Sequence, residues 1–385
     1  MESNFLSSKR PLRVIFQCNA FLPDVIGGIE VLAAHFLPRL MARGHQVLVI
    51  TSSVGGQPPG RTSYNGIDIL KFNFVEALTD RQIATTLRLG HEVDRAIAEF
   101  APDVLHINDT NTPSFFFLRQ RAIKNLPRTL TLHSPIRQAG SDGLQTRLFR
   151  EADCIVAVSN AVGADAIAHT PAIREKLIVI PNALPMPALE PTALPFAPPL
   201  LLCLGRLVVD KGFDVAVRAF ALARQRHPSA QLVISGNGNE RRPLEEMVQE
   251  LGIDEHVHFT KWVEPNAVAQ AIAEATAVLM PSRWPEPFGL VALQAAQMAR
   301  PVIASNVGGL PEVVEDQQTG ILVPPDDPSA LADAIALLLS DAAAAREMGR
   351  RARERAMSGF DFDALVEAYE TAYWRTLQIA GQTPH

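Results

Sequence analysis

Short apolar runs recur along this 385-residue sequence, and helical segments separate most of them. In the first half, the runs cover residues 12–18, 46–51, 67–72, 104–107, 129–132, 154–158 and 177–180. Helical patterns cover residues 29–43, 81–100 and 160–168. Strands that alternate with helices in this way predict an α/β fold, in which a parallel sheet carries helices on both faces. The first half is therefore expected to be Rossmann-like.

A proline-rich segment interrupts this alternation. Residues 181–199 contain seven prolines, which keep a chain extended and out of helices and sheet interiors. The alternation then resumes, with apolar runs over 200–204, 231–235, 256–259, 277–280, 301–304 and 320–323 and helical segments over 241–251, 289–298, 328–340 and 341–356. Because the chain is too long for one hydrophobic core, two domains are expected. We place them over 1–183 and 200–360, with a linker over 184–199 and a terminal helix over 361–385.

Residues 281–297 form the loop that is most informative about chemistry. They read P-S-R-W-P-E-P-F-G-L-V-A-L-Q-A-A-Q and join a predicted strand to a predicted helix. Open parallel sheets bind ligands at the carboxyl ends of their strands, and a helix start offers unpaired N–H groups to phosphate. Gly289 lets a phosphate approach the backbone, and the Glu286 carboxylate is an acceptor for sugar hydroxyls. The loop thus predicts binding of a diphosphate and a sugar.

Two further loops carry related signals. Gly205, Arg206 and Lys211 follow the run at 200–204, where a planar guanidinium and a point charge suit a diphosphate. The alternative is a pair of solvated cations. Gly28 belongs to a glycine pair between the run at 12–18 and the helical segment at 29–43, which suits either a phosphate cradle or a plain tight turn.

The residues E-P-F-G at 286–289 and G-G-L-P-E at 308–312 resemble the signature of glycosyltransferase family 4, the group 1, glycogen-synthase-like enzymes. This resemblance implies the GT-B fold, in which two Rossmann-like domains face each other across a cleft and a C-terminal helix crosses back to the first domain. It also implies a retaining enzyme that moves a hexose-type sugar from a nucleotide-sugar donor to an acceptor. The first domain would then hold the acceptor and the second the donor.

The resemblance assigns roles to individual residues. Glu286 would hold donor hydroxyls, and Arg206 and Lys211 would neutralise the diphosphate. His133 follows the run at 129–132 and would contact the donor sugar, whereas His106 lies within a strand and is expected to be packed. These four, Glu286, His133, Arg206 and Lys211, are the predicted catalytic residues. The predicted donor-binding set is Gly28, Gly205, Arg206, Lys211, Gly236, Lys261, Trp262, Glu286, Phe288, Gly289, Leu290 and Gln294.

Two positions depart from the family pattern. Gln294 stands where the family has a second Glu that holds the ribose, and a neutral amide should weaken that contact by about 1 kcal/mol. Lys261 stands where a Gly is common, in the loop beside the nucleobase. The neighbouring Trp262 would stack on the base or belong to the core. From family habit, a UDP-sugar is the expected donor and a GDP-sugar the second choice.

Composition narrows the remaining classes. Residues 1–190 carry 19 Lys and Arg against 17 Asp and Glu, a net charge of +2. Since the whole chain has a net charge of −6, the remaining residues carry −8. Neither half is strongly basic, which argues against binding of nucleic acid. No apolar run reaches membrane-spanning length, and the N-terminus lacks signal-peptide order. Cys18, Cys154 and Cys203 are expected to be buried thiols. We therefore expect a cytoplasmic protein.

No metal or other cofactor is expected, since the nucleotide sugar is a co-substrate. The one Asp-x-Asp, at residues 361–363, begins a helix where Asp is a favoured cap. The stretch 115–150 combines aromatic residues with many Lys and Arg. It predicts either a helix with a solvated basic face or contact with the inner face of a membrane. The acceptor could be a saccharide, a lipid-linked sugar or a small molecule. An epimerase of the same fold and a non-catalytic nucleotide-sugar-binding protein remain alternatives.

Overall fold

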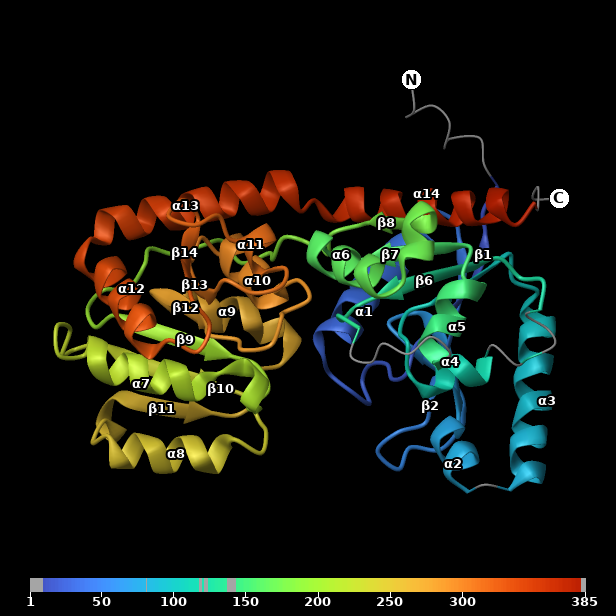
Figure 1. Cartoon of the computed structure of the whole chain (residues 1–385), viewed down its shortest axis with the longest axis horizontal. Helices are drawn as coiled ribbons and strands as arrows, with labels where there is room; N and C mark the ends of the chain where they lie inside the picture. Colours follow the sequence, from blue (N-terminus) through green and yellow to red (C-terminus); the bar gives the residue numbers. More distant parts are fainter. Residues whose placement is uncertain (1–9, 81, 118–119, 121–123, 137–142, 382–385) are drawn as a thin grey trace. The chain divides into compact units, whose positions relative to one another are not determined.

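The computed structural model describes residues 10–80, 82–117, 120, 124–136 and 143–381. The chain forms two compact units (Figure 1). Unit 1 combines Met1–Pro181 with Asp363–His385, and unit 2 is Asn182–Phe362. Each unit contains one sheet with helices packed against it, so the α/β prediction is confirmed.

The sheet of unit 1 has the strand order β3-β4-β2-β1-β5-β6-β7-β8. Its strands are β1 (Arg13–Gln17), β2 (Gln46–Ser52), β3 (Gly60–Tyr64), β4 (Ile67–Phe72), β5 (Val104–Ile107), β6 (Arg128–Leu132), β7 (Cys154–Ala157) and β8 (Leu177–Val179). The described pairings are parallel except that β3 pairs antiparallel with β4. The sequence analysis missed β3, because this edge strand is polar and exposed and shows no apolar alternation.

The helices of unit 1 include α1 (Gly28–Ala42), α2 (Phe74–Thr79), α3 (Ile83–Phe100), α4 (Thr112–Phe117), α5 (Leu144–Glu151), α6 (Asn160–His169) and α14 (Phe362–Ile379). Helices α1, α3 and α6 confirm the three helical segments expected from the apolar periodicity. The short helix α2 was not anticipated, because six residues are too few to show a helical period.

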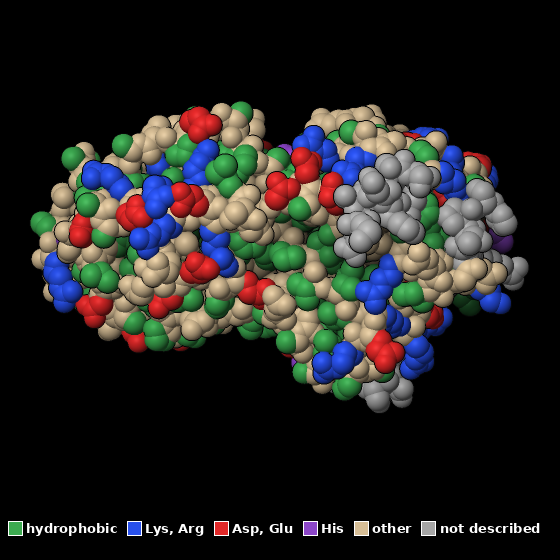
Figure 2. Space-filling view, turned by 90° about the horizontal axis from the view of Figure 1, so that it is seen from above, with side chains coloured by type: hydrophobic (Ala, Val, Ile, Leu, Met, Phe, Trp, Pro, Cys, Tyr) green, Lys and Arg blue, Asp and Glu red, His purple; other side chains and the backbone are tan. Residues whose placement is uncertain are grey.

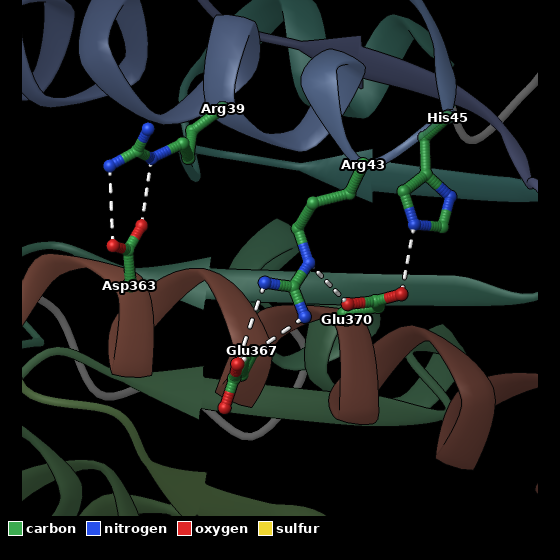
Figure 3. A network of polar contacts seen from close by, with 6 residues as sticks. All are labelled: Arg39, Arg43, His45, Asp363, Glu367 and Glu370. Carbon is green, nitrogen blue, oxygen red and sulfur yellow. Dashed lines mark hydrogen bonds and ion pairs between the residues drawn. The ribbon is translucent and has the colours of Figure 1, made fainter. Parts of the chain in front are cut away.

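The last helix, α14, packs in unit 1 from Asp363 onward, which confirms that the C-terminal helix returns to the first domain. Figure 3 shows a row of polar contacts that holds it against residues 39–45. Arg39 contacts Asp363 at 2.7 Å, and Arg43 contacts Glu370 at 2.9 Å. His45 contacts the other oxygen of Glu370 at 3.1 Å. Glu370 therefore receives hydrogen bonds on both carboxylate oxygens.

Unit 2 contains a parallel sheet of order β11-β10-β9-β12-β13-β14. Its strands are β9 (Leu200–Leu204), β10 (Gln231–Ser235), β11 (Val257–Thr260), β12 (Ala277–Met280), β13 (Val302–Ser305) and β14 (Gly320–Val323). Its helices include α7 (Phe213–Ala223), α8 (Arg241–Glu250), α9 (Val268–Ala273), α10 (Leu290–Gln297), α11 (Leu310–Val313), α12 (Pro328–Ser340) and α13 (Ala342–Gly359). The inward faces of α7 and α12 form one buried core with the sheet. The apolar runs of the second half all correspond to strands.

The proline-rich segment groups with unit 2, and its residues 182–195 form neither helix nor strand. Two buried side chains hold it. Arg300 donates to the carbonyl oxygen and to the hydroxyl of Thr192, both at 2.9 Å. Gln297 donates to the carbonyl oxygen of Leu184 at 2.8 Å. Burial lowers the pKa of Arg300 to about 10, because its charge has left water for a site made of neutral acceptors.

All three cysteines are free and buried, as expected, and burial raises the pKa of the Cys203 thiol. In the described part of the chain, no single helix has the length and apolar character to cross a membrane. One pair bent by 103°, Pro328–Ser340 with Ala342–Ile379, passes by length and composition alone. On the face shown in Figure 2, Lys and Arg side chains are interspersed with Asp and Glu.

Candidate active site

The candidate donor site lies at the carboxyl edge of the sheet of unit 2, where the strand order reverses. From β9 the chain moves to β10 and β11 on one side and then returns to β12 on the other side of β9. The loops that follow β9 and β12 therefore leave adjacent strands in the same direction. Crevices at such reversal points are where open α/β sheets bind ligands. The first loop carries Lys211 and the second carries Glu286.

Lys211 and Glu286 meet at this edge. The Lys211 Nζ atom lies 2.8 Å from each of the two Glu286 carboxylate oxygens. Their side chains are 26% and 14% exposed, so the pair is largely withdrawn from solvent, yet open enough for a ligand to reach. The buried Ser282 hydroxyl also donates to Glu286, at 3.2 Å. Glu286 is thus held in one orientation by a cation and a neutral donor.

A second ion pair joins the two loops. Arg283 forms a two-pronged contact with Asp214, at 2.6 and 2.7 Å, and also contacts Asp326. Its backbone N–H donates to the carbonyl oxygen of Asp210 at 3.0 Å. Burial of the Asp214 carboxyl favours a higher pKa, but the hydrogen bonds and charge of Arg283 outweigh it and lower the pKa of Asp214. This pair holds Lys211 and Glu286 at a set separation.

A third loop, which follows β13, contacts the backbone of Glu286. The backbone N–H of Gly309 donates to the carbonyl oxygen of Glu286 at 2.7 Å. Gly308 has φ +56°, and a Cβ there would lie 2.2 Å from the same carbonyl oxygen. Only glycine permits this close backbone approach. The G-G pair of the second signature is therefore explained by packing against the first signature.

Helix α10 begins directly beyond Glu286. Gly289 precedes its first residue with φ +101°, and no side chain caps the helix start. The first N–H groups of α10 are therefore available to an acceptor, and the helix dipole favours an anion there. The carboxylate, the cation and this helix start lie within one short stretch of the sheet edge.

The other predicted donor-site residues are distributed along the same edge. Gly205 and Gly236 follow the adjacent strands β9 and β10. Arg206 is exposed and makes no side-chain hydrogen bond or ion pair with any residue that the structure describes. Lys261 and Trp262 follow the edge strand β11. Lys261 is exposed, whereas Trp262 is half-buried and its indole N–H has no partner in the described part of the chain.

Three more of the predicted donor-binding residues lie in α10 or shortly before it. Leu290 and Gln294 are half-buried and one turn apart, so they lie on the same face of the helix. The Phe288 ring is instead 2% exposed and packs edge-on against Phe360, with ring centroids 5.6 Å apart. A ligand contact by Phe288 would therefore have to come from its backbone.

Unit 1 shows a corresponding reversal of strand order between β1 and β5. Gly28 is the first residue of α1, which follows β1, and the residues after β5 are Asn108 and Asp109. The Asp109 carboxylate accepts from the backbone N–H of Asn19 at 2.5 Å and from the Ser114 hydroxyl at 2.9 Å. Burial raises the pKa of Asp109, although these hydrogen bonds oppose the shift. The two loops at the reversal point are thus joined.

His133 follows the next strand, β6, and is half-buried beside this point. Its Nε2 atom lies 2.9 Å from the side-chain oxygen of Asn108. Burial lowers the pKa of His133 to about 4, so the ring is neutral near pH 7. His106 is fully buried, with the Tyr373 hydroxyl at 2.7 Å and the Thr131 hydroxyl at 2.8 Å. The expectation that His106 is a packed residue is confirmed.

Two other sequence expectations concern charged stretches. Within 115–150, Arg119, Arg121, Arg137 and Asp142 lie outside the described residues. Arg128 does not belong to a solvated basic face, which corrects that part of the interpretation. It is 8% exposed and pairs with Glu151 at 2.9 Å, because it begins a central strand.

In the Asp-x-Asp at residues 361–363, Asp363 pairs with Arg39. Within the described ranges, no group of three His, Cys, Asp or Glu residues could hold a metal ion.

Sequence reasoning missed several residues that support the site. Asn108 carries the same signal as His133, a polar residue directly after a buried strand, and could have been singled out on that ground. Ser282 and Arg283 carried no such signal. Their partners lie in the folded loops, and Arg283 and Asp214 are 69 residues apart in sequence.

Comparisons with known proteins agree with this architecture. Residues 26–186 match the model of Glycosyltransferase Family 4, and residues 189–355 match that of the glycosyl transferases group 1. The glycogen synthase of Mycobacterium tuberculosis is 28% identical over 404 residues, which cover 94% of each chain. Sucrose-phosphate synthase from Thermosynechococcus elongatus has a TM-score of 0.83 at 25% identity, over 96% of this chain and 100% of that chain.

A third relative matches over a shorter region. The GDP-mannose-dependent alpha-(1-6)-phosphatidylinositol monomannoside mannosyltransferase of Mycolicibacterium smegmatis is 35% identical over 170 residues, 43% of this chain and 44% of that protein. The two Rossmann-like units and these likenesses define the GT-B class of glycosyltransferases. Within this class, the chain belongs to glycosyltransferase family 4 and is a group 1 glycosyltransferase.

Proposed function

We propose that this enzyme transfers a hexose-type sugar from a nucleoside diphosphate sugar to an acceptor with retention of anomeric configuration. The observation that carries the proposal is the contact between Lys211 and Glu286 beside the uncapped start of α10. A cation and a helix start suit a diphosphate, and a carboxylate suits sugar hydroxyls. These are the two halves of one donor molecule, and the contact between Lys211 and Glu286 supports the proposal that both halves bind at this edge of unit 2.

The charge that develops during transfer explains the cations. When the bond between the anomeric carbon and the diphosphate oxygen breaks, negative charge grows on the diphosphate. Lys211, Arg206 and the first N–H groups of α10 would stabilise this charge, so they would act more strongly in the transition state than in the ground state. Arg206 suits this role because its guanidinium is exposed. Glu286 would hold the donor hydroxyls in place, and His133 of unit 1 would act in the same reaction.

The donor is proposed to be a UDP-sugar, with a GDP-sugar as the second candidate. The first choice follows the habit of the family, and the second is favoured by the mannosyltransferase relative named above. Gln294 would contact the ribose through its amide. The base would lie near Lys261 and Trp262, at the end of β11, where the unpartnered indole N–H of Trp262 offers a donor.

The remaining partners follow from the same proposal. The acceptor is a saccharide, a lipid-linked sugar or a small molecule bound by unit 1. We propose a cytoplasmic location, no interaction with nucleic acid and no requirement for a metal. The last point is supported by the chain's own cations, which supply positive charge at the proposed diphosphate position. Membrane contact through residues 115–150 stays a hypothesis.

Thermal unfolding in the presence of UDP, GDP, ADP and their sugar conjugates tests the donor site. A ligand at a hundred times its dissociation constant stabilises the folded state by about 2.7 kcal/mol. One nucleotide should raise the unfolding temperature clearly more than the others. If none shifts the transition, the departures at Gln294 and Lys261 indicate an altered nucleotide site and the proposal fails at this step.

Turnover of the preferred nucleotide sugar tests the chemistry. Replacement of Glu286 by Ala should raise the barrier to transfer by about 2–4 kcal/mol, the cost of losing a preorganised polar group. The matched control is Glu255→Ala, which removes an exposed carboxylate near β11 and should leave turnover unchanged. Recovery of an isomerised nucleotide sugar would identify an epimerase instead. Binding without transfer or release of the sugar would identify a non-catalytic binding protein.

A further inference from the structure

The hydrogen bond between His133 and Asn108 specifies which ring nitrogen of His133 carries the proton. The Asn108 atom that contacts His133 Nε2 is its side-chain oxygen, at 2.9 Å. An amide oxygen is only an acceptor, so Nε2 must be the donor. A neutral imidazole with its proton on Nε2 has a lone pair on Nδ1. Among the described residues no partner contacts Nδ1 of His133, so the ring offers one acceptor and no donor to a ligand.

The surroundings leave Asn108 as the acceptor for this proton. His133 and Asn108 border a cavity of about 10 Å³, which is space for about one water molecule. The rest of its wall is apolar, including Phe16, Phe36 and Leu365, except for His106 and Tyr369. Both nitrogens of His106 already have hydroxyl partners, and the Tyr369 hydroxyl contacts Thr131 at 3.3 Å.

The Asn108 side chain is itself held in place. It is 4% exposed, and its backbone N–H donates to the carbonyl oxygen of Gln17, on the neighbouring strand, at 2.8 Å. The next residue, Asp109, is anchored to Asn19 and Ser114. Asn108 is therefore fixed at the reversal point of the sheet of unit 1, directly beside β6, the strand that precedes His133.

We propose that Asn108 is a positioning residue, which holds His133 in the tautomer protonated at Nε2 so that Nδ1 accepts a hydrogen bond from a substrate hydroxyl. This inference rests on the proposed function, in which His133 acts in the same reaction as Glu286. It also restricts the ligand. The substrate must present a hydroxyl that can donate to His133, and an analogue that lacks this hydroxyl loses the contact. A group that only accepts, such as a methoxy or a fluoro substituent, would face the lone pair of Nδ1.

The tautomer is measured first, in the free protein, by NMR correlation between the ring nitrogens and carbon-bound protons of histidine. A His133→Gln variant assigns the signal. We expect the Nε2–H form in the wild type and a mixture or the Nδ1–H form in Asn108→Ala. The Asn108→Asp variant keeps an acceptor oxygen at the same place, and at alkaline pH it should keep the Nε2–H form. A wild-type ring protonated at Nδ1, or an unchanged tautomer in Asn108→Ala, would overturn the proposal.

Transfer is measured next. Asn108→Ala should lower kcat/KM about tenfold, in line with the effect of removing a partner that orients a histidine. In His133→Gln the same Asn108 change should have little further effect, because both residues act through one hydrogen bond. The control Gln249→Ala removes an exposed amide on α8 and should match the wild type. Full additivity of the two changes would contradict the proposal.

Donor analogues complete the test. With the wild type, one monodeoxy donor should lower kcat/KM by about the same factor as the His133→Gln change lowers it with the full donor. The His133→Gln variant should then have the same kcat/KM with that deoxy donor as with the full donor. Equal losses for every deoxy donor in both proteins would contradict the proposal. If the protein transfers no sugar at all, the proposed function fails, whereas the tautomer measurement still decides the role of Asn108.

Discussion

The polar side chains at both sheet edges work in pairs. Glu286 accepts from Lys211 and Ser282, and His133 is bonded to Asn108. A side chain held by two partners loses little conformational freedom when a ligand binds, which is the condition for a preorganised site. Gln294 is different, since its side chain has no hydrogen bond to the described residues. It is therefore free to meet a ribose without giving up an existing contact.

Replacement of Gln294 by Glu should tighten nucleotide binding about fivefold, because a charged acceptor binds ribose hydroxyls about 1 kcal/mol more strongly than a neutral one. The comparison is made by titration calorimetry with the nucleotide selected in the thermal screen. Gln249→Glu, on the exposed face of α8, controls for the added charge. Equal affinities for the wild type and Gln294→Glu would place the ribose elsewhere.

The buried His106 makes folding sensitive to acid. Burial lowers the pKa of His106 to about 3, against an ordinary value of 6.5, and the nearby His133 adds to the shift. The unfolded chain therefore binds a proton at this site below about pH 6.5, whereas the folded chain does not until about pH 3. The contribution of His106 to stability is complete above pH 6.5 and is lost as the pH falls through this window.

The free energy of unfolding should thus fall more steeply with acid in the wild type than in His106→Gln, by up to about 1.4 kcal/mol per pH unit. Urea titrations at several pH values between 6.5 and 4.5 would give this slope. The exposed His91→Gln serves as the control and should keep the wild-type slope. Parallel curves for the wild type and His106→Gln would refute the argument.

Helix α14 is held in unit 1 by both polar and apolar contacts. Its polar face contacts Arg39, Arg43 and His45 (Figure 3). Its apolar face carries Tyr373, which is fully buried. The His45 ring has one orientation available. Its Nδ1 accepts from the backbone N–H of Leu12 at 3.0 Å, so its Nε2 must donate to Glu370. Glu370 thereby connects α14 to the first strand region of the sheet.

Removal of the Glu370 carboxylate should be costly for this reason. Glu370→Ala leaves the buried Nε2–H of His45 without its acceptor and removes the nearer of the two carboxylates that contact Arg43. It should lower the free energy of unfolding by about 2–3 kcal/mol. Glu367→Ala, one turn earlier, removes a 55% exposed carboxylate that lies 3.5 Å from Arg43. It should cost less than about 1 kcal/mol. Denaturant unfolding of both variants gives the comparison, and similar losses would mean that the buried contacts of Glu370 are unimportant.

At the scale of the whole chain, the two sheets have the same feature at the point where their strand order reverses. In each, the loops at the reversal of strand order are joined by side chains, Arg283 to Asp214 in unit 2 and Asp109 to Asn19 in unit 1. Their chemistry differs, because the described loops of unit 2 carry the cations. This difference fits the proposal that unit 2 binds the anionic donor and that His133 of unit 1 makes neutral polar contacts.

If the chain's own cations neutralise the diphosphate, turnover should not depend on a divalent metal. Dialysis against EDTA, followed by assay in metal-free buffer, should leave the rate within about twofold of the rate with added magnesium, since Lys211 and Arg206 already provide the charge. A rate that collapses on chelation and returns with magnesium or manganese would contradict this prediction.

The membrane hypothesis makes a separate prediction about the intact protein. Lys124 and Arg150 are exposed, whereas Arg128 and Arg147 both pair with Glu151, whose single negative charge offsets part of the positive charge of the described part of the stretch 115–150. Any binding should therefore be sensitive to salt. Flotation with anionic and neutral liposomes at low salt tests it. Protein that remains in solution with both would remove membrane contact from the proposal.

Much of this fold was predictable, because the signals are local. Apolar runs of four to seven residues, interrupted by loops and helical periods, are visible without any knowledge of partners. Arg128 shows the limit of such reasoning. A run of positive residues suggested a solvated face, but Arg128 begins a strand whose neighbours bury it, and only its pairing with Glu151 makes that burial tolerable. The polar edge strand β3 was invisible for the opposite reason, since no apolar pattern marks it.

The candidate site divides in the same way. His133 could be singled out because it directly follows a strand, Glu286 because it lies in the loop before a helix, and Lys211 because it shares a loop with Arg206. Their partners could not, because contacts such as Lys211 with Glu286, 75 residues apart, exist only once the strands are ordered in the sheet. The amino-acid pattern thus predicts two largely parallel sheets and which loops follow the carboxyl ends of their strands. Tertiary packing selects the loops that meet, the carboxylate that is paired and the ring nitrogen of His133 that is left to accept a hydrogen bond.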